Sequence, residues 1–281
     1  MNYRHSFHAG NFADVVKHSL LLLLLEALGQ KAAPWHYFDT HAGTGAYDLA
    51  GDDAHRTGEA LGGILRLWPA RGHLPPPAEA LCNRVAELNP GLAPATLPRY
   101  YPGSPWLAAA LARESDRLTL AELHPEDAAS LKAEFRRDTR MAVHCRDGYE
   151  MLAALTPPAE RRGLALLDPS YESPGEFERL AEAVSASHAR WPGGIYALWY
   201  PLKDESARKR FLRGMERSGL RRLLLTEFRL SSQADSLAGS GLLVLNPPWK
   251  SDGQMRECLA ALVPVLAPGV GSSEVSWLVP E

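Results

Sequence analysis

Residues 35–45 read Trp35-His-Tyr-Phe-Asp39-Thr-His-Ala-Gly43-Thr-Gly45 and join a short apolar segment to a glycine-rich turn. The segment predicts a buried β-strand, and the two glycines let the backbone pass close to a ligand. A dinucleotide-binding fingerprint needs a third glycine where this chain has Asp48, and no Gly-Lys-Ser/Thr of a P-loop follows. The stretch therefore predicts the first strand and ligand-binding turn of an α/β fold, although a Gly-x-Gly alone also fits an ordinary tight turn.

Apolar runs and helical patterns alternate along most of the chain. The runs predict seven strands, at residues 35–39, 118–122, 141–145, 164–168, 195–200, 223–227 and 242–245. Helices fit between most of them, and this alternation is typical of a mostly parallel, doubly wound α/β sheet.

Residues 51–98 interrupt the alternation. They contain seven of the 22 prolines and no clear strand, whereas residues 58–68 and 78–88 have helical periodicity. We therefore expect three parts. Residues 1–50 hold an N-terminal tail, the first helix and the start of the sheet domain, residues 51–98 form a small helical insertion, and residues 99–281 complete the sheet domain.

Six consecutive leucines at residues 20–25 predict a fully buried helix. Asn11 followed by Asp14 resembles a capping box at its start, and Gly29 fits its end. Glu26 ends the apolar run far short of the ~18 residues that a spanning helix needs. Because Asp14 and a polar stretch precede the run, we expect no signal peptide, no membrane segment and a cytoplasmic protein.

The composition is 46% hydrophobic and 22% charged over 281 residues, which excludes a disordered, collagen-like or coiled-coil chain. Lys plus Arg is 30 and Asp plus Glu is 33, so no global positive field indicates nucleic acid. Cys82, Cys145 and Cys258 form no C-x-x-C pair and indicate reduced thiols rather than a disulfide framework or a zinc site.

A polyanion site would therefore need a local cluster of charge. Residues 203–222 hold eight basic and three acidic side chains, a net charge of +5. Arg210, Arg213, Arg217 and Arg221 have a spacing that places side chains on one helical face. This segment is a candidate RNA contact, with a solvated helix face as the alternative.

Acidic residues follow the next predicted strands, and in open α/β sheets ligands bind beyond the carboxyl ends of strands. Glu122 ends the strand at 118–122, where a carboxylate can hold two ribose hydroxyls. It follows Asp39 by 83 residues rather than by ~20, which the insertion and the helix after it would explain. Asp147 and Gly148 follow the next strand, where the carboxylate can accept from an adenine amino group. Each acid alone fits a cap or a surface group, but together with the glycine turn they follow the order of a nucleoside-binding methyltransferase.

Asp168-Pro169-Ser170-Tyr171 comes at the end of the strand at 164–168 and resembles the Asp-Pro-Pro-Tyr motif of amino methyltransferases. An exocyclic adenine amine is a poor nucleophile because its lone pair is delocalised into the ring. Asp168 and the Pro169 carbonyl can accept its N–H bonds and favour the pyramidal, nucleophilic form, and Pro169 biases Asp168 towards extended geometry. Tyr171 can stack on an extruded base, an interaction worth ~1–3 kcal/mol. The alternative is a plain turn after a buried strand.

A second motif, Asn246-Pro247-Pro248-Trp249, is closer to the generic pattern but follows the last predicted strand. That position is far from the reacting methyl group if the residues from Asp39 to Asp147 bind the cofactor. We therefore interpret it as a structural turn with a packed tryptophan.

Ser104-Pro105 opens an apolar helix, with Ser104 as its N-cap and Pro105 at its first position. Backbone donors at that helix start can face a ligand carboxylate. His5, His8 and His18 have no Cys or carboxylate at ligand spacing, so we expect RNA or cofactor contacts there and no metal site.

Longer motifs run from residue 3 to residue 281: Tyr3-Arg-His-Ser-Phe-His-Ala-Gly-Asn11 with Asp14 and Lys17-His18, Asp39-Thr-His-Ala-Gly43, Arg99-Tyr-Tyr-Pro-Gly-Ser-Pro105, Glu122-Leu-His-Pro125, Ala197-Leu-Trp-Tyr-Pro201 and Val275-Ser-Trp-Leu-Val-Pro-Glu281. With these motifs the chain resembles the RlmJ family of 23S rRNA adenine-N6 methyltransferases. Residues 51–98 are the least alike, and Ser170 departs from the family's second proline.

The resemblance implies S-adenosylmethionine as the sole cofactor, with contacts at His18, His41, Ser104, Glu122, Asp147, Gly148 and Asp168. It makes Asp168 the catalytic carboxylate. It implies substrate contacts at Tyr3, His5, Lys17, Pro169 and Tyr171. It also implies a mobile N-terminal tail that closes over the active site.

The sequence thus predicts a Rossmann-like class I S-adenosylmethionine-dependent methyltransferase with a seven-stranded, mostly parallel sheet. We expect a monomeric enzyme that methylates adenine N6 in 23S rRNA, where the base is extruded or unpaired because a stacked amino group is unreachable. One alternative is a weakly active or inactive RNA-binding relative, which only Ser170 supports. Another is an amino methyltransferase acting on DNA or on protein glutamine, which the N-terminal motif disfavours.

Overall fold

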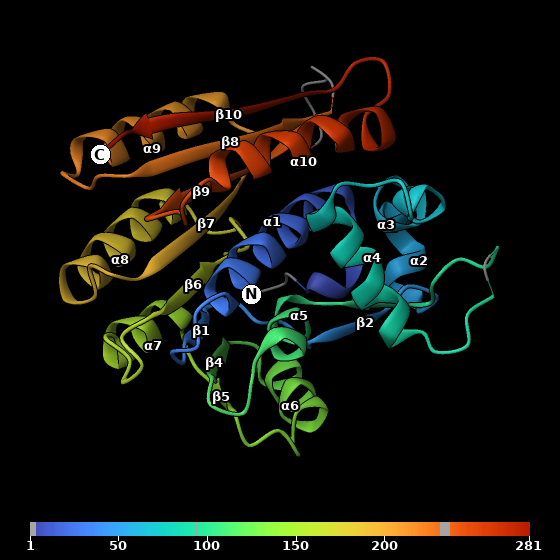
Figure 1. Ribbon diagram of the computed structural model, residues 1–281, viewed down its shortest axis with the longest axis horizontal. Coiled ribbons are helices and arrows are strands. Elements are labelled where there is room, and N and C mark those ends of the chain that lie inside the picture. Colours follow the sequence, from blue (N-terminus) through green and yellow to red (C-terminus); the bar gives the residue numbers. More distant parts are fainter. Residues whose placement is uncertain (1–3, 94, 231–236) are drawn as a thin grey trace.

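The computed structural model describes residues 4–93, 95–230 and 237–281, and shows an eight-stranded sheet between two layers of helices (Figure 1). The strands of this sheet are β1 (His36–Asp39), β4 (Arg117–Glu122), β5 (Met141–Cys145), β6 (Gly163–Leu167), β7 (Ile195–Pro201), β8 (Leu223–Arg229), β9 (Gly239–Leu245) and β10 (Ser272–Val279). A separate two-stranded ladder consists of β2 (Ala46–Asp48) and β3 (Tyr100–Pro102).

The α-helices are α1 (Phe12–Gly29), α2 (Asp52–Thr57), α3 (Ile64–Leu67), α4 (Pro76–Leu88), α5 (Ser104–Leu111), α6 (Pro125–Glu134), α7 (Gly148–Leu155), α8 (Glu176–Arg190), α9 (Glu205–Arg217) and α10 (Ser251–Leu266). Short 3-10 helices are η1 (His5–Phe7), η2 (Glu59–Gly62) and η3 (Trp68–Ala70). Helices α1, α5, α6 and α10 pack on one face of the large sheet, and α7, α8 and α9 pack on the other.

The strand order is β10-β8-β9-β7-β6-β1-β4-β5. Strands β5, β4, β1, β6 and β7 are parallel, whereas β9 is antiparallel to β7 and β8, and β10 is antiparallel to β8. The mostly parallel α/β fold is confirmed, but the expected seven strands were one too few. None of the side chains of β10 is fully buried, so this edge strand lacks the continuous apolar run that marks the others.

The centre of the sheet is closed to solvent on both faces. All five residues of β6 are buried, as expected for a parallel strand between two layers of helices. The loops at the carboxyl ends of the parallel strands are therefore where this fold can form a ligand site.

The first helix begins and ends as predicted. The Asn11 side-chain oxygen accepts the Asp14 N–H at 2.9 Å, and Gly29 is the last helical residue. Residues 20–25 are all buried, in a helix that contacts α4, α5, α10 and the sheet. Across the described parts of the chain, no helix has an apolar stretch long enough to cross a membrane.

Residues 51–98 lie between β2 and β3, whose pairing joins Ala46 to Pro102 at the base of the segment. Helix α4 agrees with the predicted helix at 78–88. The predicted helix at 58–68 is wrong, because η2 and α3 are separated at Gly63. A Cβ at Gly63 would lie 2.0 Å from the Gly10 carbonyl oxygen, so this break lets the segment pack against the loop before α1.

Residues 203–222 form α9 and the turn after it. The helix ends at Arg217 and the chain turns at Gly219, which has φ 81°, so Arg221 is not helical and the expected shared face of four arginines is wrong. Arg208 faces inward, where its Nε lies 2.5 Å from the buried Glu227. RNA contact by the exposed arginines of α9 stays a prediction.

Candidate active site

A cavity opens where β1, β4 and β6 end, beside the first turns of α1. The topology brings together there all the side chains assigned from sequence to the cofactor and three assigned to the substrate. The lining includes His18, His41, Ser104, Glu122, Asp147, Gly148, Asp168, His5, Lys17 and Pro169. Tyr171 is not among the lining residues, and Tyr3 lies outside the described residues.

Asp39 ends β1 next to the cavity, with its carboxylate fully buried. It accepts hydrogen bonds from the Ser104 hydroxyl at 2.7 Å and the Tyr37 hydroxyl at 2.8 Å. Burial raises the pKa of Asp39 to about 6, because it disfavours the charged form more than these donors favour it. The expectation that Ser104 caps α5 is wrong. Gly103 precedes the helix as its cap, and the Ser104 hydroxyl instead ties α5 to β1.

Glu122 is the last residue of β4 and is 8% exposed. Its two carboxylate oxygens accept the N–H groups of Gly43 and His124, each at 2.8 Å. Gly43 has φ 61°, and a Cβ there would lie 2.1 Å from the Tyr47 hydroxyl, so the turn closes on Glu122 only with glycine. Burial raises the pKa of Glu122 despite these bonds. Each oxygen keeps a free lone pair, which suits a pair of ribose hydroxyls.

Asp147 caps α7, since one of its oxygens accepts two N–H groups of the first turn at 2.9 and 3.1 Å. The other oxygen lies 2.5 Å from the guanidinium of Arg179 on α8, a partner that no sequence pattern indicated. Burial alone would raise the pKa of Asp147, but these hydrogen bonds outweigh burial, so the pKa lies below its usual value. Gly148 packs tightly on the first turn of the site, because a Cβ there would lie 1.9 Å from the Thr40 carbonyl oxygen.

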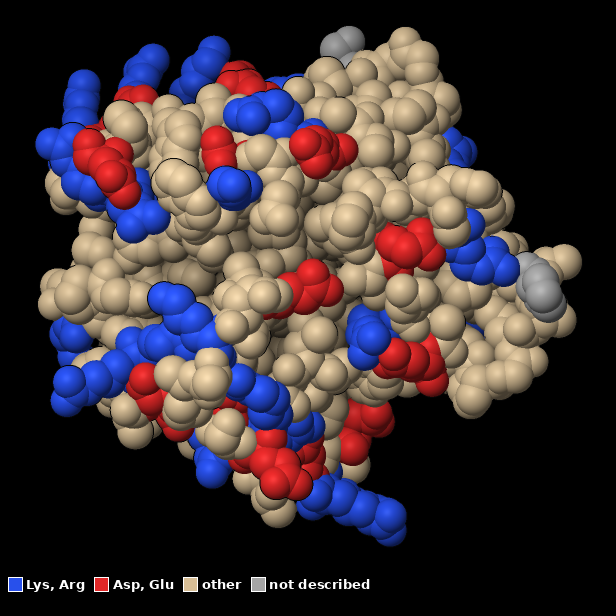
Figure 2. Space-filling model, viewed as in Figure 1, with Lys and Arg blue, Asp and Glu red and all other residues tan. Residues whose placement is uncertain are grey.

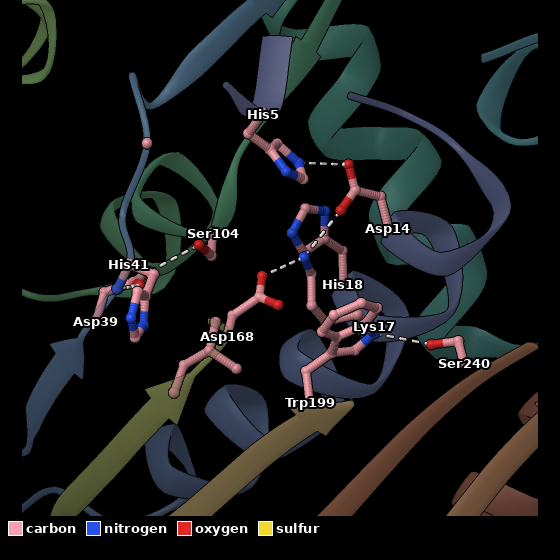
Figure 3. A network of polar contacts seen from close by, with 12 residues as sticks. His5, Asp14, Lys17, His18, Asp39, His41, Ser104, Asp168, Trp199 and Ser240 are labelled. Carbon is pink, nitrogen blue, oxygen red and sulfur yellow. Dashed lines mark hydrogen bonds and ion pairs between the residues drawn. The ribbon is translucent and has the colours of Figure 1, made fainter. Parts of the chain in front are cut away.

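Asp168 follows β6 and faces α1, where it pairs with Lys17 (Figure 3). Lys17 Nζ lies 2.5 Å from Asp168 and 2.8 Å from Asp14, and the Lys17 and Asp14 side chains are only 4% and 2% exposed. Asp14 also accepts from the Gly10 N–H and from His5 Nε2, each at 2.9 Å. Burial alone would lower the pKa of Lys17, but the two carboxylates outweigh burial. The pKa is therefore raised, and the ammonium group stays charged. Sequence reasoning assigned Lys17 to the substrate and missed its contact with Asp168.

His18 and His41 contribute neutral rings to the cavity. Burial lowers the pKa of His18 to about 3 and that of His41 to about 4. His18 Nδ1 lies 2.8 Å from the Tyr101 hydroxyl, and His41 Nδ1 lies 2.8 Å from the Thr40 hydroxyl. The two rings therefore offer hydrogen bonds without adding positive charge.

Tyr171 lies behind the turn that carries Asp168. Its hydroxyl donates to the Trp199 carbonyl oxygen at 2.6 Å, and its ring contacts the rings of Phe177 and Trp199. The Trp199 indole N–H donates to Ser240 at 2.9 Å, and Lys17 Nζ lies 5.7 Å from the centre of its ring. Tyr171 thus stacks within the protein here, and its contact with an extruded base stays a prediction.

The second motif lies at the other edge of the sheet, because β9 is antiparallel to β7 and ends opposite its start. The Asn246 side chain donates to the carbonyl oxygens of Pro192 and Gly194 at 2.8 and 2.9 Å, so this is the structural turn expected. The expectation of a packed tryptophan is wrong, since Trp249 is 86% exposed. Left-handed backbone at Asn246 and Lys250 sets the path of this turn and leaves the indole in solvent.

No group of three metal-ligating side chains occurs among the described residues. All three cysteines are free thiols, of which Cys82 and Cys258 are buried and Cys145 is exposed.

The mostly parallel sheet and the cavity at the carboxyl ends of its strands define a class I S-adenosylmethionine-dependent methyltransferase fold. A model of the family described as "Ribosomal RNA large subunit methyltransferase D, RlmJ" matches residues 32–279. The chain therefore belongs to the RlmJ family, as its sequence motifs predicted.

Individual relatives agree over the full length of the chain. It is 44% identical to the ribosomal RNA large subunit methyltransferase J of Escherichia coli and 40% identical to that of Haemophilus influenzae, with 100% of each chain covered. A crystal structure of protein LPL1258 from Legionella pneumophila is similar with a TM-score of 0.89 and 34% identity, covering 96% of this chain and 98% of that one.

Proposed function

We propose that the protein transfers the methyl group of S-adenosylmethionine to N6 of an adenine in 23S rRNA. The observation that carries this proposal is that Asp168 and Pro169 line the same cavity as Glu122 and Asp147. A carboxylate and a carbonyl can accept the N–H bonds of an adenine amine beside the groups that suit a nucleoside cofactor. The names of the Escherichia coli and Haemophilus influenzae relatives support large-subunit rRNA as the substrate.

The residues present fit S-adenosylmethionine, which supplies an activated methyl group on a sulfonium cation. Glu122 would hold the ribose hydroxyls, and Asp147 would accept from the adenine amino group of the cofactor. Gly148 lets the start of α7, which carries Asp147, lie directly against Thr40, because a Cβ there would clash with the Thr40 carbonyl oxygen. His18, His41, Ser104 and Asp168 complete the proposed contacts. Five carboxylates and two cations line the cavity, so its potential favours a cationic ligand: Glu122, Asp127, Asp147, Asp168 and Glu176 against Lys17 and Arg179.

Asp168 would act by orienting the target amine rather than as a strong base. Its carboxylate and the Pro169 carbonyl accept the N–H bonds and direct the nitrogen lone pair at the methyl group. The amine becomes acidic once the methyl group has transferred, so it then loses its proton readily. Lys17 fixes the Asp168 carboxylate from the side of α1 and remains charged throughout. The target base must leave its stack to reach these groups.

The test is transfer of a labelled methyl group to unmodified 23S rRNA, followed by mapping, with duplex DNA and glutamine-containing protein as competing substrates. Asp168→Ala should lower kcat by a factor on the order of 10²–10³, the loss typical of one electrostatic stabiliser. Asp168→Asn should be milder if its amide oxygen faces the amine. A matched control is Asp204→Asn, because this exposed carboxylate caps α9 and asparagine caps equally well. Full activity of Asp168→Ala, or methylation of DNA or protein alone, would refute the proposal.

We also propose that the N-terminal tail contacts the target nucleotide through Tyr3. In support, η1 lies in the tail and its His5 lines the cavity. Deletion of residues 1–9 should abolish transfer to RNA while circular dichroism stays that of the folded protein. Tyr3→Phe should be milder than Tyr3→Ala if ring stacking is the interaction. Robust methylation by the truncated protein would contradict this role.

Finally, we propose a cytoplasmic monomer. The exposed free thiol of Cys145 is compatible with a reducing compartment. Sedimentation equilibrium at micromolar concentration should give a single species of about 30.8 kDa. A larger mass would show an oligomer.

A further inference from the structure

Residues 246–250, here named the Trp249 turn, display an aromatic ring that the proposed active site does not use. Trp249 is 86% exposed, more than any other large apolar side chain in the described ranges. Leu245 pairs with Tyr196 next to the start of β7, so the turn lies at the edge of the sheet opposite the cavity. Strand β7, which runs between the two edges, is seven residues long, which corresponds to roughly 20 Å.

The Trp249 turn is held rigidly. Asn246 and Lys250 have φ 56° and 64°, a left-handed conformation that non-glycine residues rarely adopt. Two hydrogen bonds from the Asn246 amide hold one end, and a bond from the Ser251 hydroxyl to the Pro248 carbonyl oxygen at 2.6 Å holds the other. The backbone that carries the indole is therefore held in place, so a partner that stacks on the ring has no loop to order.

The surroundings of the Trp249 turn are basic, in contrast to the cavity. Residues 160–162, 190–194, 221–222 and 246–250 carry six basic and one acidic side chain. Glu281, 3.4 Å from Arg222, and Asp252 in the first turn of α10 bring the acidic total to three and the net charge to 6 − 3 = +3. On the side of the molecule where α9 and the C-terminus lie in Figure 1, Figure 2 shows Lys and Arg side chains with Asp and Glu side chains among them.

We propose that the Trp249 turn is a second RNA-binding surface. Trp249 stacks on an unpaired base of the substrate RNA away from the target nucleotide, and the exposed Lys250 and Arg221 bind the flanking phosphates. Stacking on an exposed indole tolerates any base, and the neighbouring cations suit the RNA backbone. This inference rests on the proposed function only in taking RNA as the substrate.

The test measures binding of unmodified 23S rRNA transcribed in vitro, by filter binding without cofactor. Trp249→Ala should weaken binding roughly tenfold, the effect expected from loss of one base–aromatic stack, and Trp249→Phe should recover much of it. Val270→Ala is the matched control, because Val270 is 70% exposed on the turn between α10 and β10. It should bind like wild type. The thermal midpoint of Trp249→Ala should not change, since its ring has almost no contacts to lose.

Salt dependence tests whether the two cations bind the phosphates of the RNA. Lys250→Gln and Arg221→Gln should each reduce the slope of log affinity against log salt by about 0.7–0.9, whereas Trp249→Ala should leave the slope unchanged. Equal RNA affinity of wild type and Trp249→Ala would overturn the inference. So would a defect seen only with ribosomal particles, which indicates a protein partner, or a change in sedimentation, which indicates a second copy. Binding without methyl transfer would refute the proposed function and leave this surface standing.

Discussion

Neutralising Asp14 should destabilise the protein strongly, because this carboxylate is central to the buried charges of the site. It is 2% exposed and lies 2.8 Å from Lys17, which is itself only 4% exposed. In Asp14→Asn, the amide oxygen can still accept from the Gly10 N–H, but Lys17 keeps only Asp168 as an anionic partner. Asp168 is 14% exposed and lies on another element, so it compensates only in part.

The magnitude follows from the burial of the pair. Breaking a buried ion pair by removing one charge costs about 3–5 kcal/mol, and the remaining contact with Asp168 places this change near the lower end. A chain of this size loses roughly 2–4 °C of thermal midpoint per kcal/mol, so we expect a decrease of about 6–12 °C at pH 7. Differential scanning calorimetry measures this, with Asp204→Asn as the exposed control.

The pH dependence gives a second readout. Burial alone would raise the pKa of Asp14, but His5 and Lys17 hold it well below 3.8. A carboxyl group with a depressed pKa contributes stability above its unfolded pKa and loses it as the pH falls through its folded pKa. The difference in thermal midpoint between wild type and Asp14→Asn should therefore be largest at pH 5–7 and decrease below about pH 4. A thermal midpoint of Asp14→Asn less than 2 °C below that of wild type at pH 7 would refute the role assigned to this ion pair. So would a difference in thermal midpoint that does not change with pH.

Three further predictions concern the cofactor side of the cavity. Glu122→Gln should weaken S-adenosylmethionine binding tenfold or more by calorimetry, because each lost charge-assisted hydrogen bond contributes ~1.5–3 kcal/mol, and unchanged affinity would remove Glu122 from the site. The pKa of Asp39 is raised from 3.8 to about 6 on folding, so the stability that the protonated carboxyl contributes is lost as the pH rises from about 4 to 6. The thermal midpoint of wild type should therefore fall relative to that of Asp39→Asn over this range. Thermal midpoints that change in parallel with pH in the two proteins would contradict the shift. Gly148→Ala should destabilise the protein by at least ~1–3 kcal/mol and weaken cofactor binding, since its Cβ would lie 1.9 Å from the Thr40 carbonyl oxygen, whereas Gly253→Ala, with nothing within 4 Å, should do neither.

Sequence patterns predicted which residues line the cavity because the rule they used is topological. The carboxyl ends of parallel strands meet at one edge of the sheet. Strand order along the chain therefore sufficed to predict that the turn at Gly43, Glu122, Asp147 and Asp168 lie close together. The helix cap at Asn11 could also be predicted from the sequence, because it depends only on Asn11 and on Asp14, three residues later.

Contacts that depend on the relative placement of distant elements could not be read in this way. Lys17 meets Asp168 across 151 positions, and the meeting depends on how α1 lies over the sheet. Arg179 reaches Asp147 from α8 for the same kind of reason. Trp249 shows a different failure, because its hydrophobicity indicates burial while the local backbone conformation exposes it.

The burial of α1 also bears on how the chain folds during synthesis. The helix, whose leucines at residues 20–25 are buried, contacts α4 and α5 but also α10 and β9, which lie near the other end of the chain. At roughly 5–20 residues per second, α10 leaves the ribosome some 12–50 s after α1. For that interval one of the most apolar segments of the protein lacks part of its final covering. We therefore expect truncations that remove α10 to aggregate rather than fold.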